Sequence, residues 1–331
     1  MKVLFQIRKD YKINIAGDTI VCENLRDALM RSGIQVDLCS EPVVNYSRYQ
    51  IIHIFNTIRV QESLQFAKNA AAKNMKVALT PIYWDLREYY KEINETERID
   101  AWNRNERKRK YIFDISALIL PHCGGERELL YKNYKVPYEK QVIVPYGIKP
   151  LSMAYNEKYI LSKYGVKDYI LCVARVHHQK NQLSLLKAME KEKIPIVLVG
   201  SLNDPKYLKE CFHIKRDQVF YLEQIDRQAL FSIYKEAKVH VLPSWVEFPG
   251  LVNLEAGAAG SNVVTTERGT AREVCKNYVS YCRPNDIQSI YEGTMKEYEK
   301  RKSNDFRDFI MANYTWDQAA QKIIQAYHSI I

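Results

Sequence analysis

Short aliphatic runs alternate with helix-like segments along almost the whole chain, and this alternation restricts the fold more than any other feature. In the first half the aliphatic runs lie at 2–7, 34–38, 50–55, 77–80, 117–120 and 142–146. Helical patterns at 60–74 and 126–134 separate several of them. Such alternation of β and α segments predicts a parallel sheet covered by helices on both faces.

The same pattern restarts in the second half. Aliphatic runs occur there at 169–173, 196–199, 219–222, 239–242 and 262–265. The stretch 147–168 has no strong apolar periodicity and reads as a connection, and 331 residues usually exceed one core. We therefore predict an α/β protein of two Rossmann-like, doubly wound domains, 1–148 and 149–314, that face each other across a ligand-binding cleft. The last segment, 315–331, is predicted to be an amphipathic helix, which Thr315 or Asn313 would cap.

Composition excludes several other classes of protein. No window reaches the roughly 18 apolar residues of a membrane span, and the N-terminus lacks a signal-peptide core, so we expect a cytoplasmic protein. The seven cysteines show no CxxC or zinc spacing, and no metal site is expected. No G-x-G-x-x-G follows a strand, which disfavours a dinucleotide oxidoreductase.

The net charge of +10 is spread over both halves, with one local concentration. Basic and aromatic residues are not interleaved along a stripe, which disfavours nucleic-acid binding. The concentrated cations are Arg104, Arg107, Lys108, Arg109 and Lys110. They form either a solvated helix face or a contact with an anionic partner, such as the inner membrane surface or a lipid-phosphate acceptor.

The most informative stretch is 239–259, where a strand, a short loop and a helix follow one another. Gly250 lets the backbone approach a ligand closely, and the helix beginning near Leu251 offers free N–H groups that suit a phosphate. Glu247 and Glu255 flank this turn, eight positions apart. Carboxylates beside a phosphate site repel it unless they bind hydroxyls, so the pair favours a nucleotide-sugar over simple surface charge.

Two cations follow the strand at 169–173. Arg175 and Lys180 are expected at the carboxyl end of that strand, at the same sheet edge as the helix start at Leu251. A diphosphate is the natural partner of two such cations. Taken singly, each would be an ordinary surface charge.

These residues carry a family resemblance. The segment from Glu247 to Glu255 resembles the E-x7-E signature of the retaining glycosyltransferases of family 4, which have the GT-B fold. Further landmarks similar to that family follow in the same order. They are Gly17, Arg175 with Lys180, 197–200 (VLVG), Pro243-Ser244, 269–273 (GTARE) and 314–316 (YTW).

The resemblance implies a role for each matching residue. Arg175 and Lys180 would neutralise the donor diphosphate, Glu247 would contact the donor sugar, and Glu255 would hold the ribose. The turn at Gly250, Leu251 and Val252 would offer N–H groups. Gly17 would let the first loop approach the diphosphate, and the base would lie near Gln224 and Ile225. The final helix would pack back on the N-terminal, acceptor-binding domain, and neither a metal nor another cofactor would be needed.

The sequence also departs from the family. The usual Glu-Gly-Phe-Gly is Glu247-Phe-Pro-Gly250, and a histidine that relatives carry after the fourth strand is absent from 80–85. Tyr83, Trp84 and Asp85 are candidates to line the acceptor side instead, because aromatic faces stack on sugars. Trp84 fits a partly buried core position equally well. His53 and His122 lie at strand ends and are further acceptor candidates.

The resemblance therefore implies a retaining hexosyltransferase that moves a sugar from a nucleotide-diphospho-sugar, with UDP the base-rate choice. The acceptor would be a glycan, a lipid-linked glycan or another hydroxyl, in the assembly of surface polysaccharides or glycoconjugates. Two alternatives remain open: a phosphorylase or sugar-nucleotide hydrolase of the same fold, and a non-catalytic scaffold or partner subunit.

Overall fold

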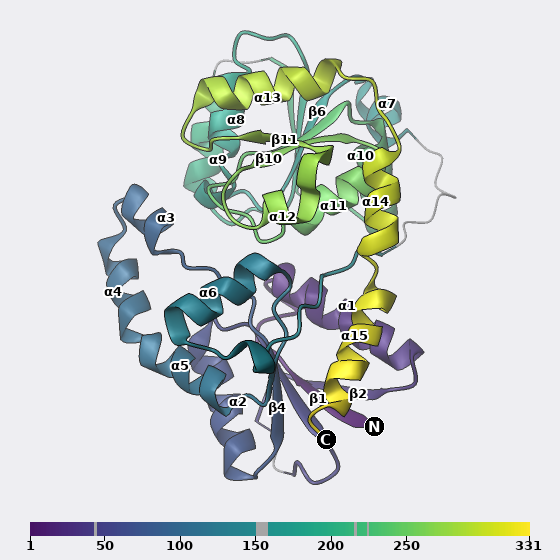
Figure 1. Cartoon of the computed structure of the whole chain (residues 1–331). Helices are drawn as coiled ribbons and strands as arrows, with labels where there is room; N and C mark the ends of the chain where they lie inside the picture. Colours follow the sequence, from purple (N-terminus) through teal and green to yellow (C-terminus); the bar gives the residue numbers. More distant parts are fainter. Residues whose placement is uncertain (43–44, 150–157, 215–216, 224) are drawn as a thin grey trace. The chain divides into compact units, whose positions relative to one another are not determined.

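The computed structural model describes residues 1–42, 45–149, 158–214, 217–223 and 225–331 (Figure 1). The chain folds into two units. The first comprises Met1–Lys149 with Tyr314–Ile331, and the second comprises Pro150–Asn313. Part of the predicted connection and Gln224, expected near the base, lie outside the described residues.

The first unit is built on a five-stranded parallel sheet with the order β2-β1-β3-β4-β5. The strands are β1 (Lys2–Gln6), β2 (Gln35–Cys39), β3 (Ile51–Phe55), β4 (Lys76–Thr80) and β5 (Leu118–Ile119). From β1 the chain passes to β2 at one edge of the sheet, and from β3 it passes through β4 to β5 at the other edge. The topological switch point, where open α/β sheets bind ligands, therefore lies between the carboxyl ends of β1 and β3.

Helices cover both faces of this sheet. One face carries α1 (Gly17–Arg31) and α15 (Trp316–His328), which pack against each other, and the other carries α2 (Val60–Ala72) and α5 (Glu106–Ile115) (Figure 1). The remaining helical segments of the unit are α3 (Arg87–Glu92), α4 (Thr96–Arg104), α6 (Gly124–Tyr134) and η1 (Tyr138–Lys140). The predicted final helix is confirmed, and Thr315 caps it: its hydroxyl accepts from the Gln318 N–H at 3.3 Å in a capping box.

The strand predicted at 142–146 does not form. The Val142 N–H donates to the Ile119 carbonyl and the Val144 N–H to the Pro121 carbonyl, so the segment follows β5 only briefly. Pro145 then interrupts it, because proline has no N–H to extend a ladder.

The second unit is built on a six-stranded parallel sheet with the order β11-β10-β9-β6-β7-β8. The strands are β6 (Ile170–Val173), β7 (Ile196–Val199), β8 (Val219–Leu222), β9 (Val239–Leu242), β10 (Asn262–Thr266) and β11 (Ser280–Cys282). The predicted strands of this half are therefore present. The switch point of this unit lies between β6 and β9, which are neighbours in the sheet.

Helices also cover both faces of the second sheet (Figure 1). They are α7 (Tyr159–Tyr164), α8 (Gln182–Ala188), α9 (Pro205–Phe212), α10 (Arg227–Glu236), α11 (Leu251–Ala258), α12 (Ala271–Cys275), α13 (Ile287–Glu299) and α14 (Asp305–Asn313), with 3-10 turns η2 (His178–Lys180) and η3 (Lys276–Tyr278). The central strands are buried along their whole length, which is why β6 reads as an unbroken apolar run. A hydrophobic core packs residues of α8, α9 and α13 against β6 and β9.

Candidate active site

Lys180 and Glu247 meet at the switch point of the second unit. Lys180 ends η2, which follows β6, and Glu247 lies in the loop between β9 and α11. Lys180 Nζ is 2.6 Å from Glu247 Oε1, and the side chains keep only 20% and 6% of their surface exposed. A charge-assisted hydrogen bond in this partly dry position is stronger than a surface ion pair. The structure therefore joins one predicted phosphate-binding cation to the predicted sugar-binding carboxylate.

Hydrogen bonds from the Asn181 side chain and from the backbone hold the two loops together. The Asn181 amide donates to the carbonyls of Pro243, at 3.0 Å, and Pro284, at 2.8 Å. The Trp245 N–H donates to the Gln179 carbonyl at 2.9 Å. The bonds that involve Pro243 and Trp245 connect the segment after β6 to the segment after β9, and the bond to Pro284 adds the segment after β11. The fold therefore fixes the position of Lys180 relative to Glu247.

A third loop, after β10, is hydrogen-bonded to the backbone of Glu247. The Thr270 N–H donates to the Glu247 carbonyl at 2.9 Å, and the Glu247 N–H donates to the Arg268 carbonyl at 3.2 Å. Gly269 lies between these bonds with φ +93°, and a Cβ added to it would lie 2.0 Å from the Glu247 carbonyl oxygen. Only glycine allows the two loops to approach this closely.

Gly250 makes room beside the carboxylate. It precedes α11 in a left-handed conformation, φ +73°, and a Cβ there would lie 2.6 Å from Asn253 Nδ2 and 3.2 Å from Glu247 Oε2. The predicted helix start at Leu251 is confirmed, and Leu251 and Val252 are half-buried in its first turn. The turn therefore leaves the carboxylate and the first N–H groups of α11 close together.

The remaining donor-side candidates lie around this centre. Glu255 is half-buried on α11, and the Tyr234 hydroxyl donates to it at 3.3 Å. Arg175 follows β6 and is exposed, and its carbonyl accepts from the Gln182 amide at 2.9 Å. Ile225 is half-buried after β8, which lies at the edge of the sheet two strands from β6.

In the first unit, Gly17 is exposed at the start of α1, and a Cβ on it would meet no atom within 4 Å. An ion pair that was not predicted from the sequence fixes this loop. Arg8, after β1, pairs with Asp18 at 2.7 Å, and both side chains are 4% exposed. The Asn56 amide, after β3, donates to Asp18 at 2.9 Å. Arg8 could have been found in the sequence because it is a charged residue that follows a predicted strand, as Arg175 is.

The charge of Asp18 is stabilised by its partners in this network. Burial alone would raise the pKa of Asp18, but the hydrogen bonds from Arg8 and Asn56 and the charge of Arg8 lower it below its usual value. Arg8 also donates to the carbonyl of Asn14 at 2.5 Å. The switch point of the first unit therefore holds an ionised carboxylate that orders the loop before Gly17.

Three acceptor candidates, His53, Tyr83 and His122, are wrong, because their side chains lie inside the first unit. His53 is fully buried beneath α15, with Nδ1 2.5 Å from the Tyr327 hydroxyl and Nε2 2.8 Å from the Thr80 hydroxyl. Burial lowers its pKa to about 3, so the ring is neutral. Tyr83 is also fully buried, and its ring packs edge-on against Tyr134. His53 lies in the middle of β3 and not at a strand end as predicted, whereas Tyr83 follows β4. Both side chains point into the core.

His122 is likewise buried, and its ring stacks on Tyr146. Its Nδ1 lies 2.6 Å from Glu126 Oε2. Burial lowers the pKa of His122, but the charge of Glu126 and the hydrogen bonds around the ring raise it to about 10. Among the predicted acceptor residues, Trp84 and Asp85 are the ones that keep part of their surface exposed.

The basic cluster is not a uniform surface. Arg109 is 2% exposed, and its guanidinium carbon lies 3.8 Å from the centre of the Trp102 ring. It donates to the carbonyls of Thr57 and Trp102, each at 3.2 Å. The prediction that Arg109 contacts a membrane is therefore wrong. Arg104 and Arg107 are exposed, Lys108 is half-exposed, and Lys110 is exposed but pairs with Asp114 at 2.7 Å.

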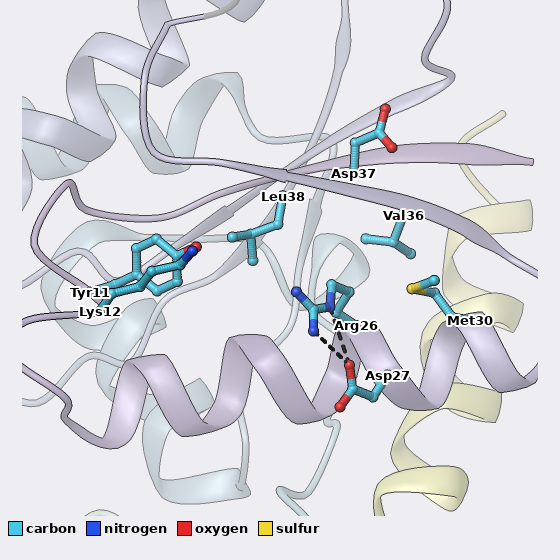
Figure 2. Close-up of a pocket in the computed structure, with 8 residues that line it drawn as sticks. All are labelled: Tyr11, Lys12, Arg26, Asp27, Met30, Val36, Asp37 and Leu38. Carbon is cyan, nitrogen blue, oxygen red and sulfur yellow. Dashed lines mark hydrogen bonds and ion pairs between the residues drawn. The ribbon is translucent and has the colours of Figure 1, made fainter.

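A pocket of about 570 Å³ lies elsewhere in the first unit, between the loop after β1, α1 and β2 (Figure 2). Tyr11, Lys12, Leu38 and Met30 line it, together with the Arg26–Asp27 ion pair. None of the predicted site residues lines it. In the part of the chain that the structure describes, no helix is long and apolar enough to cross a membrane.

Comparison with known proteins gives the following relationships. Residues 156–316 match the family model described as "Glycosyl transferases group 1". An uncharacterized glycosyltransferase of Methanocaldococcus jannaschii is 30% identical over 238 residues, 64% of this chain and 60% of the relative. A D-inositol 3-phosphate glycosyltransferase of Paenarthrobacter aurescens is 27% identical over 182 residues, 50% of this chain and 44% of the relative. The matched segments thus span only part of these curated relatives, 60% of the first and 44% of the second.

Solved structures extend the likeness to the whole fold. Sucrose-phosphate synthase of Thermosynechococcus elongatus aligns with a TM-score of 0.79 at 16% identity, covering 99% of this chain and 98% of that one. Anabaena HepE, solved with UDP and glucose, aligns with a TM-score of 0.76 at 14% identity, covering 99% and 100%. At these identities the likeness establishes the fold, which is GT-B.

Proposed function

We propose that this chain, whose residues 156–316 carry a glycosyltransferase group 1 domain, transfers a sugar from a nucleotide-diphospho-sugar to a hydroxyl acceptor. The observation that carries the proposal is the Lys180–Glu247 pair at the switch point of the second unit, beside the turn at Gly250. It combines a cation, a carboxylate and free N–H groups, which are the groups that a diphosphate and a sugar require.

In this proposal the second unit binds the donor. Lys180 and Arg175 neutralise the diphosphate as it leaves, and the N–H groups of Leu251 and Val252 contact its oxygens. Glu247 orients the donor sugar and stabilises positive charge at the anomeric carbon. Glu255, on the next turns of α11, accepts from the ribose hydroxyls, and Ile225 lies on the side of the base.

We propose UDP as the nucleotide. The HepE structure contains UDP and glucose, and its fold is shared with this chain. This supports UDP as the nucleotide but does not identify the sugar. We further propose transfer with retention at the anomeric carbon. The leaving phosphate would accept the proton of the acceptor hydroxyl as the glycosidic bond forms on the same face, so that no protein nucleophile and no metal is required.

The first unit is proposed to bind the acceptor, through Trp84 and Asp85, with Gly17 leaving room for the diphosphate. The acceptor would be a glycan or lipid-linked glycan in surface polysaccharide or glycoconjugate assembly. Arg104, Arg107, Lys108 and Lys110 would hold the protein at an anionic membrane surface. Flotation with anionic vesicles tests this last part: the four neutralising substitutions should abolish flotation, and unchanged flotation would contradict it.

The experiment that tests the function is a panel of UDP-, GDP- and ADP-sugars, read by thermal shift and by slow hydrolysis of the donor. We expect one nucleotide-sugar to raise the unfolding temperature and to be hydrolysed. A donor that binds without turnover, with or without acceptors, would favour the non-catalytic alternative. The absence of binding by every member of the panel would contradict the proposal.

A further inference from the structure

The segment that follows β4 is held more tightly than an ordinary surface loop. Ile82 has φ +48°, a left-handed conformation that is unfavourable for a β-branched residue. The next residue, Tyr83, is fully buried, and its N–H donates to Glu126 Oε1 at 2.6 Å. Backbone strain of this kind persists only where the surrounding structure enforces it. Here Glu126 and the buried Tyr83 ring enforce it.

The other end of the segment is anchored as well. Asp85 accepts from the Arg87 guanidinium, with Nε 2.9 Å from Oδ1. The Asn133 amide, on α6, donates to the Tyr83 hydroxyl at 3.0 Å. Trp84 lies between the two anchored residues and is the residue of the three that combines a large aromatic ring with partial exposure.

Glu126 is the centre of this arrangement. Its carboxylate is fully buried in the first turn of α6 and accepts from the N–H groups of Tyr83 and His122, at 2.6 and 2.7 Å. It also lies 2.6 Å from His122 Nδ1. One carboxylate thus connects the segments that follow two adjacent strands, β4 and β5, at the carboxyl edge of the sheet.

Stability alone is a poor reason for this arrangement. Replacing a buried ion pair by apolar side chains is often neutral or stabilising, because removing two charges from water is costly. The strained Ile82 adds a further cost. Both features are explained if the geometry of the segment matters for a ligand at the sheet edge.

We infer that Glu126 is a positioning residue that holds Trp84 as a platform for the pyranose ring of the acceptor. The inference rests on the proposed function and names a residue through which the acceptor side of that function would work. Trp84 would contact the sugar, because the face of an indole ring packs well on the apolar face of a pyranose. Glu126 would touch no substrate and would act only through the backbone of Tyr83.

The test uses the full chain and methyl α-glycosides of glucose, mannose, galactose and N-acetylglucosamine, with binding followed by ligand-observed NMR. We expect at least one to bind. Trp84→Ala should weaken it about tenfold, since a ring contact contributes up to about that factor. Trp84→Phe should retain most of the affinity. Glu126→Gln keeps the shape but replaces one carboxylate oxygen by an NH₂ group, so the side chain can no longer accept from the Tyr83 and His122 N–H groups together, and binding should weaken severalfold.

A matched control lies on the same helix. Glu128 is exposed and accepts from the Tyr138 hydroxyl at 2.8 Å, so Glu128→Gln should leave binding unchanged. Because Glu126 acts through Trp84, Glu126→Gln should have no further effect in the Trp84→Ala background. Additive losses would overturn the positioning role, and unchanged binding in Trp84→Ala would overturn the platform.

UDP binding separates this inference from the proposed function. UDP should bind all of these variants as it binds the wild type, because they lie in the first unit. UDP binding together with no glycoside binding would overturn the inference and leave the proposed function standing. Glycoside binding without binding of any nucleotide-sugar would contradict the proposed function and leave the platform at Trp84 standing.

Discussion

Lys180 Nζ lies 2.6 Å from Glu247 Oε1, so the cation proposed for the diphosphate and the carboxylate proposed for the sugar neutralise each other in this structure. A diphosphate would compete with Glu247 for Lys180. The carboxylate therefore lowers affinity for the nucleotide while serving the sugar. The effects of substitutions on nucleotide binding and on transfer should then differ in direction.

Glu247→Gln is expected to bind UDP severalfold more tightly than the wild type and to lose transfer. The amide has nearly the same shape but leaves Lys180 without its anionic partner. Titration calorimetry with UDP measures the first effect, and donor hydrolysis measures the second. Glu267→Gln is the control, because Glu267 pairs with Arg272 at 3.0 Å on the exposed side of the next loop. Weaker UDP binding by Glu247→Gln would contradict the competition.

Gly269→Ala should strongly destabilise the protein and abolish UDP binding. A Cβ there would overlap the Glu247 carbonyl oxygen at 2.0 Å, in addition to the cost of φ +93°. Gly260→Ala is the matched control, because Gly260 has φ +88° and no atom within 4 Å of its would-be Cβ. The control isolates the backbone cost of about 1–2 kcal/mol. Equal losses of unfolding free energy in urea would show that the loop contact contributes nothing.

Arg109→Ala should lower the free energy of unfolding by about 2–4 kcal/mol, because it leaves the buried carbonyls of Thr57 and Trp102 without their donor. Arg107, on the same helix, is exposed, and Arg107→Ala should change stability by less than about 0.5 kcal/mol. Chemical unfolding of the two variants makes the comparison. A surface-like effect of Arg109→Ala would contradict its structural role.

Acid should destabilise the fold through two buried neutral histidines. Burial lowers the pKa of His53 and of His240 to about 3, whereas an unfolded histidine titrates near pH 6.5. Between these values the unfolded chain binds more protons, so stability falls as pH falls through this window. His53→Gln should remove up to about 2 kcal/mol of the loss between pH 7 and 5. His213 is exposed, and His213→Gln should leave this loss of stability unchanged. An unchanged dependence of stability on pH in His53→Gln would show that His53 is not a source of the acid destabilisation.

The alternation of strands and helices predicts much of this structure because it reports directly which segments are buried in a parallel sheet. The meeting of Lys180 and Glu247 is predictable for the same reason: the strands they follow end at one sheet edge. The turn at Gly250 and the start of α11 are predictable from the local sequence, because glycine favours such a turn. The failure at 142–146 is local too, since Pro145 marks where the ladder stops.

Side-chain direction is what the sequence pattern does not specify. His53 lies within β3, and Tyr83 follows β4 as Lys180 follows β6. One residue of register decides whether such a side chain enters the core or faces a ligand. Arg109 reads as a surface charge because its partner carbonyls belong to residues 57 and 102. Glu126 and Asp18 lie in the first turns of helices, where acidic residues are common without any further role.

The most direct test of the central claim is turnover of the nucleotide-sugar panel by the wild type and by Lys180→Ala, followed by NMR of the anomeric proton. We predict that the wild type cleaves one α-linked nucleotide-sugar and releases or transfers the sugar with the α configuration, and that Lys180→Ala folds but does neither. A β product would contradict retention. Equal turnover by the two proteins would show that the Lys180–Glu247 site is not where the chemistry occurs.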